Sequence, residues 1–319
     1  MTPSKIFYKI RTDKTYLLRS YLADMLVMSA LILFLLKINW QINIDVTFFK
    51  VVVIGVFALI NGLIVSSLLH NASHSNVSTK LFNRIVGEYC GYWVLYGFTN
   101  FSLVHILHHQ HSDDEMDPVN PKGMSFIVFL SAPMRYMIKA AKAYLFSVHG
   151  KEEDYHKIMK AQTVVFHLNL VLRLAIWYIF LGNFLFLFFY IPSFLTIVTI
   201  FAHINYVCHR DHVDGSVEIV NLNHNLYYKV ANFFTMGGYF HKNHHTNMKL
   251  FNPMSLEHKH SKKKLLTIQS KIYLNPNEQY IFTGSFISKY FSLNSVWIHG
   301  ERNRVLAPRK FNEHPTSWL

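Results

Sequence analysis

Long apolar runs separated by polar stretches are the main pattern of the first 200 or so residues of this chain. Residues 21–38 and 47–69 are each long enough to cross the roughly 30 Å hydrocarbon layer of a bilayer as one helix. The run at 164–202 is about twice that length, and Gly182-Asn183 near its middle is typical of a turn. The pattern therefore predicts four spans, at about 21–38, 47–69, 164–181 and 184–202.

The polar segments predict how these spans are oriented. Residues 1–20 are basic and not apolar enough for a signal peptide, which indicates a cytoplasmic amphipathic segment. The link between the first two runs is poor in Lys and Arg, so we expect the chain to cross the membrane and return. Both termini and residues 70–162 are then cytoplasmic. The apolar segments 90–104 and 124–134 are short, which favours helices at the interface, although 90–104 is alternatively a third span.

Composition supports a membrane protein and excludes several other classes. Of the 319 residues, 51% are hydrophobic and 16% aromatic, and the formal net charge is +13. Basic residues in such a chain are typical of cytoplasmic loops and contacts with anionic headgroups, and no nucleic-acid-binding module is recognisable. Cys90 and Cys208 have no paired spacing, which predicts no disulfide and a reducing compartment.

No repeat or composition boundary divides the chain before its last 60 or so residues. We expect one domain at 1–258 and a basic polar tail at 259–319. The tail's lysine cluster is expected to contact the membrane surface or an acidic electron carrier. Arg173 would lie within the third span, where an unpaired charge is costly, and the sequence identifies no partner for it.

Histidine is the unusual residue, since 20 histidines outnumber the 18 acidic residues. His105, His108 and His109 form HILHH at helical spacing, so one helix would present several imidazoles to a metal. A lone HxxHH is a weak signal, but HNASH, NYVCH and HKNHH also lie at span ends or in the cytoplasmic segments. So many imidazoles exceed the four ligands of one zinc ion. The count predicts two metal ions, of a kind that imidazole suits: Fe, Cu, Ni or Zn.

The motifs HNASH, HILHHQHSDDEMDP, NYVCH and GGYFHKNHH, with the runs between them, resemble the membrane fatty acid desaturase family over residues 20–250. The resemblance implies an all-α integral membrane protein, with four transmembrane helices and a cytoplasmic helical cap that holds two iron ions. It also implies an O2-dependent enzyme that introduces a double bond into a lipid acyl chain. The implied metal ligands are His70, His74, His105, His108, His109, His209, His241, His244 and His245, with Asn205 acting indirectly through water.

The implied partners are a membrane lipid or acyl-carrier substrate and an external electron donor such as ferredoxin or cytochrome b5. The first box, HNASH, has the HxxxH spacing of acyl-lipid desaturases and related hydroxylases, whereas acyl-CoA desaturases usually have one more residue, so the substrate carrier stays open. No HPGG-type cytochrome b5 segment is present, and electrons are expected from a separate protein.

Two other functions fit parts of the pattern. A di-iron hydroxylase or ketolase acting on a lipid, sterol or carotenoid would use the same ligands. A metal transporter or sensor would instead require metal-binding residues along a pathway through the spans. Most histidine motifs here lie at span ends, and His167 is the main exception.

Residues near the motifs have less specific expectations. The acidic residues after HILHH orient ligand imidazoles through their second nitrogen or pair with lysines, with neither favoured: Asp113, Asp114, Glu115 and Asp117. Hydrogen bonding or solvent exposure, rather than metal contact, is expected of His111, His203 and His212. Interfacial anchoring is favoured over lining a substrate tunnel for Trp93, Tyr96 and Trp177. Surface positions are expected for His149, His156, His258, His260, His299 and His314.

Overall fold

The structure is a computed structural model that describes residues 3–40, 42, 44–114, 117–120, 124–131, 133–150, 154–211 and 217–256. The chain forms two compact units, one of Met1–Ile106 with Ile138–Ile200 and one of Leu107–Met137 with Phe201–Leu319. Several expectations lie outside the described residues: those for Glu115, for His212, for the tail at 259–319 with its lysines, and for the histidines from His258 onward.

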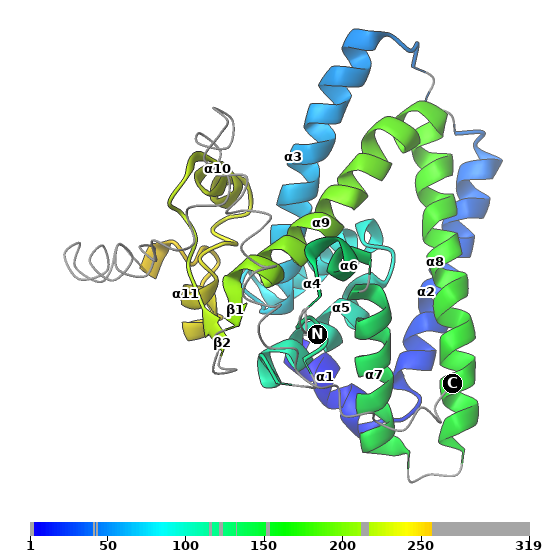
Figure 1. The fold of residues 1–319 in the computed structure, drawn as a ribbon. Coiled ribbons are helices and arrows are strands. Elements are labelled where there is room, and N and C mark those ends of the chain that lie inside the picture. Colours follow the sequence, from blue (N-terminus) through cyan, green and yellow to red (C-terminus); the bar gives the residue numbers. More distant parts are fainter. Residues whose placement is uncertain are drawn as a thin grey trace. The chain divides into compact units, whose positions relative to one another are not determined.

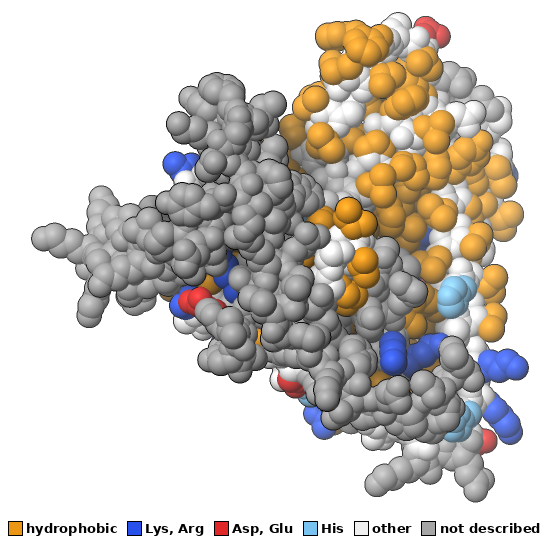
Figure 2. Space-filling view, viewed as in Figure 1, with side chains coloured by type: hydrophobic (Ala, Val, Ile, Leu, Met, Phe, Trp, Pro, Cys, Tyr) orange, Lys and Arg blue, Asp and Glu red, His pale blue; other side chains and the backbone are white. Residues whose placement is uncertain are grey.

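The first unit is built on long apolar helices (Figure 1). Helix α2 is Tyr16–Lys37, α3 is Phe48–Ser73 and α8 is Tyr155–Leu185. Helix α2 packs along α8, and Asn169 Nδ2 of α8 donates to the Tyr21 carbonyl of α2 at 2.9 Å. Apolar side chains cover much of the described surface (Figure 2), including Leu26 and Phe57, which are 68% and 62% exposed. Such a surface suits lipid rather than water.

The apolar segment after α8 continues without a loop. A short π-helix η1, Phe186–Tyr190, joins α8 to α9, Ile191–Cys208. Gly182 has φ 68° and ψ 173°, outside the helical region, and the chain turns back there (Figure 1). Glycine adopts this backbone without steric cost, so the turn predicted at Gly182-Asn183 is confirmed.

Within the described residues, three helical segments are long and apolar enough to cross a membrane: Tyr16–Lys37, Phe48–Ser73 and the 54-residue segment Tyr155–Cys208. The first two correspond to the predicted spans at 21–38 and 47–69. The third contains both remaining predictions in one continuous segment that is bent at Gly182. The segment at 90–104 is not one helix, because α4, Lys80–Trp93, ends before α5, Gly97–Gln110, begins. The alternative of a span at 90–104 is therefore wrong.

Arg173 of α8 is paired. Its Nη2 lies 3.0 Å from Asp24 Oδ2 of α2, and its side chain is 3% exposed. It also donates to the Leu95 carbonyl between α4 and α5, and its guanidinium lies 5.5 Å from the ring centroid of Tyr92. A Cβ at Gly97 would come within 2.9 Å of Nη2. Sequence patterns identified no partner for this charge because its partners come from two distant segments, α2 and the turn before α5.

Trp177 of α8 reaches the same turn. Its Nε1 donates to the Tyr92 carbonyl at 3.1 Å, and its ring centroid lies 4.3 Å from that of Trp93. The tryptophans are 9% and 3% exposed, so the expectation that they anchor the protein at the interface is wrong. Together with Arg173, Trp177 supplies side-chain hydrogen bonds to carbonyls at the end of α4 and in the turn that follows it.

Helix α1, Pro3–Thr12, is amphipathic, and Ile6 and Ile10 on its apolar face are 0% and 1% exposed. His149 at the end of α7, Pro133–His149, is also buried, and its Nε2 lies 2.7 Å from the Ile10 carbonyl. The expectation of a surface position for His149 is therefore wrong. The sequence pattern of α7 does not reveal that its last residue, His149, packs against α1. The burial of His149 is therefore seen only in the folded structure.

The second unit places short elements around buried tyrosines and asparagines. Its helices and strands are α6, Phe126–Ser131, β1, His209–Asp211, β2, Val217–Ile219, α10, Leu226–Phe234, and α11, His241–Thr246. The antiparallel pair β1–β2 matches His209 with Ile219. Asn232 of α10 donates to the Leu222 carbonyl at 2.8 Å and accepts from the Tyr239 amide at 2.9 Å. These bonds fix the segment that leads into α11.

Candidate metal centre

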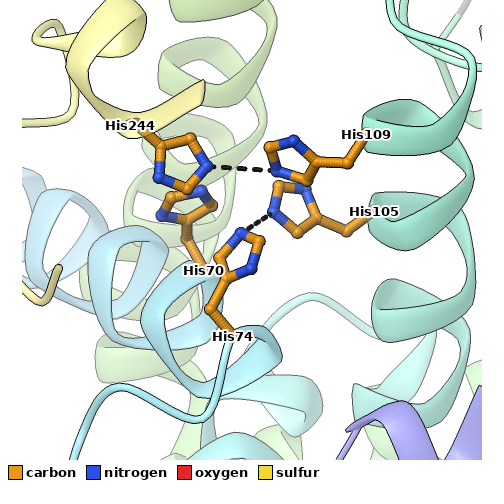
Figure 3. A group of neighbouring side chains, drawn as sticks. All are labelled: His70, His74, His105, His109 and His244. Carbon is orange, nitrogen blue, oxygen red and sulfur yellow. Dashed lines mark hydrogen bonds between the residues drawn. The ribbon is translucent and has the colours of Figure 1, made fainter. Parts of the chain in front are cut away.

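The first histidine group lies within the first unit, where α3 ends and α5 passes. His70 lies in the last turn of α3 and His74 is its C-cap. Their rings lie near that of His105, with ring centroids 4.7 and 4.6 Å from it. Nε2 of His74 is 2.6 Å from Nε2 of His105 (Figure 3). Each of the three offers a ring nitrogen within 4.8 Å of the others. We call this group the trio.

The second group lies within the second unit and is more deeply buried. It consists of His108 on α5, His209 at the start of β1, and His241 and His245 on α11. Their ligand atoms all lie within 4.8 Å of one another. Nε2 of His241 is 2.9 Å from Nε2 of His209 and 3.2 Å from Nε2 of His245. We call this group the quartet.

A pair of histidines in the second unit accompanies the quartet. Nε2 of His109 is 3.1 Å from Nε2 of His244 (Figure 3), and the ring centroids of His109 and His245 are 4.7 Å apart. Helix α5 carries His105 of the trio as well as His108 and His109. The HxxHH spacing therefore does not put all three imidazoles on one ligand group, because the ring of His108 joins the quartet.

The nitrogen separations fit metal coordination. Two nitrogens that each lie about 2.1 Å from one ion, at right angles, are about 3.0 Å apart. The close contacts between ring nitrogens in the three groups run from 2.6 to 3.2 Å. Ring nitrogens from different segments therefore lie at separations expected of ligands that share one cation.

Acidic side chains hold two members of the quartet by their other ring nitrogen. His108 Nδ1 lies 2.9 Å from Asp117 Oδ1, and His209 Nδ1 lies 2.7 Å from Asp113 Oδ1. An Nδ1–H that donates to a carboxylate leaves the Nε2 lone pair for a metal and fixes the ring orientation. Of the two roles considered for these carboxylates, the structure shows the orienting one. Asp114 instead bonds His111 Nδ1 at 2.9 Å, away from the quartet.

Both orienting carboxylates remain ionised. Burial opposes the charged form of Asp117, but the charge and hydrogen bond of His108 and the amides of Asp113 and Val119 lower its pKa overall. Burial also opposes ionisation of Asp113, and its hydrogen bond to His209 lowers the pKa below the usual value. Asp117 also accepts hydrogen bonds from the amides of Asp113 and Val119, and Asp113 accepts one from the Ser112 hydroxyl, so both carboxylates order the loop after α5.

His241 is kept neutral. Burial and the neighbouring His245 and His209 lower its pKa well below the usual value. A metal ligand must be deprotonated, so burial prepares this imidazole for a cation. The donor set is thus imidazole with ionised carboxylates behind it, which suits iron, copper or zinc.

A reciprocal amide pair positions α11. Asn221 Nδ2 donates to Asn243 Oδ1 at 2.8 Å, and Asn221 Oδ1 accepts from the Asn243 amide at 3.1 Å. Asn243 also donates to the Pro253 carbonyl at 3.2 Å. Sequence reasoning did not single out either asparagine, although Asn243 lies inside the HKNHH motif between the two histidine positions it orders.

The structure brings all nine predicted histidines into the trio, the quartet and the pair. His209 differs in its local structure, because α9 ends at Cys208 and His209 begins β1 instead of extending the helix from Asn205. Asn205 Nδ2 donates to the Phe201 carbonyl at 2.8 Å, and its indirect role through water stays a prediction. His167, the histidine expected within a span, is exposed on α8 and bonds the Thr163 carbonyl.

Apolar helices of membrane-spanning length and two histidine clusters define an integral membrane protein with the means to bind metal ions. Residues 46–251 match the family model for fatty acid desaturases, so this chain belongs to the fatty acid desaturase family and is an oxidoreductase. No curated protein and no solved structure matches the chain. The predicted family is confirmed over about two thirds of the sequence.

Proposed function

We propose that the protein is an O2-dependent fatty acyl desaturase that introduces a double bond into a lipid acyl chain with a pair of iron ions. The observation that carries this proposal is the quartet: four imidazoles from three separate segments converge, and two of them are held by carboxylates. Family membership supports the choice of reaction. The desaturation itself, rather than metal binding alone, is the part that requires a test.

The quartet is proposed to bind one iron ion and the remaining histidines to bind the other. Each group supplies ring nitrogens at separations that suit coordination, and Asn205 is proposed to act on the metal through water. Since His105 and His108 both lie on the continuous helix α5, a single element presents ligands for both ions. The full ligand set is His70, His74, His105, His108, His109, Asn205, His209, His241, His244 and His245.

The residues of this chain have three tasks in the reaction. The imidazoles hold the ions, and when iron is bound with O2 it supplies the oxidising power that a methylene group requires. Asp113 and Asp117 keep His209 and His108 in the tautomer that presents Nε2. The apolar helices bring the acyl chain from the bilayer, and burial of the quartet excludes water from the reacting carbons.

We further propose four membrane spans, with the segment Tyr155–Cys208 crossing twice as a hairpin. Its 54 residues exceed the roughly 20 that one crossing needs, and the bend at Gly182 supports a reversal there. In this topology the histidine groups and both termini are cytoplasmic, where an external donor such as ferredoxin or cytochrome b5 delivers two electrons. The lysine cluster of the C-terminal tail is proposed to contact that donor or the membrane surface.

The experiment is lipid profiling of cells with and without the protein, together with the iron content of the purified chain. We expect about two iron ions per chain and one class of acyl chain that lacks two hydrogens, absent when His245→Ala is expressed at the same level. A product that instead gains one oxygen would identify a hydroxylase on the same site. Unchanged lipids with full iron content in the presence of a working donor would contradict the proposed reaction.

A further inference from the structure

A hydrogen-bonded set of one histidine and two tyrosines lies in the second unit beside the quartet's segment. His203 Nδ1 is 2.5 Å from the hydroxyl of Tyr239 and 3.3 Å from that of Tyr227, and the two hydroxyls are 3.0 Å apart. His203 and Tyr239 are 1% and 0% exposed. None of the three belongs to the metal-binding groups, so metal coordination does not explain the set.

Tyr239 is both close to the metal ligands and firmly held. It precedes the quartet's His241 by two residues, so their Cα atoms are at most about 7 Å apart. Its amide donates to Asn232 Oδ1 at 2.9 Å, and its carbonyl accepts from the Leu222 amide at 2.8 Å. This places a readily oxidised phenol two residues from a metal ligand.

Aromatic rings continue from Tyr239 to the surface. The ring centroids of Tyr239 and Tyr228 are 5.0 Å apart, and Tyr228 is 5.0 Å from His224. Tyr228 is 1% exposed, whereas His224 is exposed. Tyr227 also contacts both, with centroids 6.0 Å from Tyr239 and 5.2 Å from Tyr228. The rings form a continuous series from the buried phenol to solvent.

We propose that Tyr239 and His203 form a redox pair that discharges the oxidised metal centre when no acyl chain is bound. The proposal rests on the proposed function, because the metal centre with O2 is the oxidant. In the step, Tyr239 gives one electron to that centre and its hydroxyl proton to His203 Nδ1. The products are a neutral phenoxyl radical and a protonated imidazole, and the centre is reduced by one electron.

The hydrogen bonds supply what this step needs. A phenol loses its electron far more readily when its proton has an acceptor already in place, and His203 Nδ1 accepts in the tautomer that carries hydrogen on Nε2. The Tyr227 hydroxyl then donates to the Tyr239 oxygen, which stabilises the radical. The same one-electron donor protein that supplies desaturation returns an electron through Tyr228, and the proton moves back from His203 to the phenolic oxygen.

A centre able to take hydrogen from an unactivated methylene is also able to oxidise a phenol, whose O–H bond is weaker. With substrate present, the acyl carbon is the intended reductant. Without substrate, oxidation of the ligand imidazoles and nearby residues would inactivate the protein. The redox pair instead lets Tyr239 be oxidised, and the electron-donor protein then reduces Tyr239 again.

The test uses the full-length, iron-loaded protein, reduced with dithionite and mixed with O2 in the absence of acyl substrate. Samples frozen at intervals are measured by electron paramagnetic resonance. We expect a tyrosine radical in the wild type whose spectrum narrows when the protein carries ring-deuterated tyrosine. Tyr239→Phe should lose the signal at unchanged iron content, whereas Tyr206→Phe, another buried tyrosine of the same unit, should retain it.

A second readout follows damage to the protein. After repeated cycles without substrate, peptide mass spectrometry should find more oxidised residues around His241 in Tyr239→Phe than in Tyr206→Phe. A wild-type signal that does not narrow with deuterated tyrosine overturns the redox pair without any variant. Absence of a radical in a wild type that binds iron and desaturates overturns the redox pair alone. A wild type that binds no iron overturns the proposed function as well.

Discussion

The carboxylate of Asp113 accepts a hydrogen bond from His209 Nδ1 at 2.7 Å across 96 residues of sequence. The loop after α5 thereby fixes the orientation of an imidazole that belongs to β1.

We expect Asp113→Asn to lower iron affinity about tenfold to a hundredfold, because it removes the charge that orients His209. Competition with a chelator measures this. Asp114→Asn is the matched control, since Asp114 bonds His111 and is 52% exposed, and an equal loss in both variants would contradict the assigned role.

His209 is the ligand that a search for HxxHH alone would miss. His209→Ala should abolish desaturation and reduce bound iron, because Nε2 of His209 faces that of His241 at 2.9 Å. His111→Ala should keep most of both, since His111 bonds Asp114 outside the quartet. Asn205→Ala should be intermediate, because another water can partly replace a ligand that acts through water. Equal tolerance of the two histidine substitutions would exclude His209 from the metal centre.

The Arg173–Asp24 pair should stabilise the helices more than it serves the chemistry. Arg173→Met leaves Asp24 without its cation and removes the bond to the Leu95 carbonyl, and we expect a loss of about 3 kcal/mol in unfolding free energy. Asp24→Asn combined with Arg173→Met should recover part of that loss, because no uncompensated charge remains. Thermal unfolding in detergent measures the difference, and a double variant no more stable than Arg173→Met would contradict charge pairing as the cause.

Gly62 allows α3 and α9 to approach closely. A Cβ at this position would lie 2.5 Å from Thr196 Cβ and 2.7 Å from the Ser193 carbonyl oxygen. Gly62→Ala should therefore destabilise the protein by about 1 to 3 kcal/mol through overpacking. Gly55→Ala lies on the same helix, where an added Cβ meets nothing within 4 Å. It should be neutral or slightly stabilising, and similar melting temperatures for the two variants would contradict the close approach.

The proposed topology predicts where reporters become accessible. Fusions that end near residue 42, between α2 and α3, and near Gly182 should report the side of the membrane opposite the cytoplasm. Fusions near residues 120 and 256 should report the cytoplasm, because the histidine groups are proposed to lie there. A reporter on the far side at residue 120 would place the quartet's loop away from the electron donor and contradict the proposed reaction.

Hydrophobic runs and motif spacing were sufficient to predict the helical class, the first two long apolar helices, the Gly182 turn and the nine histidines that the structure brings into groups. Local patterns carry these features. The pairing of Asp24 with Arg173, the burial of His149 and the assignment of His108 to the quartet depend on which distant segments meet. Helical spacing predicted that His105 and His108 belong to one ligand group. In the structure, His108 instead groups with histidines of β1 and α11. For Asp113 and Asp117, a run of acids next to imidazoles indicated two roles, and only coordinates distinguish them.

The sequence positions of the two histidine groups also impose an order on biosynthesis. The trio is complete once residue 105 has been made, whereas the quartet requires His245, which is made after most of the chain. A nascent chain that stops before α11 can therefore hold at most part of the ligand set, however well its helices insert. Metal loading of the quartet must follow synthesis of the second unit, so truncated translation products should be inserted in the membrane yet unable to retain a full complement of metal.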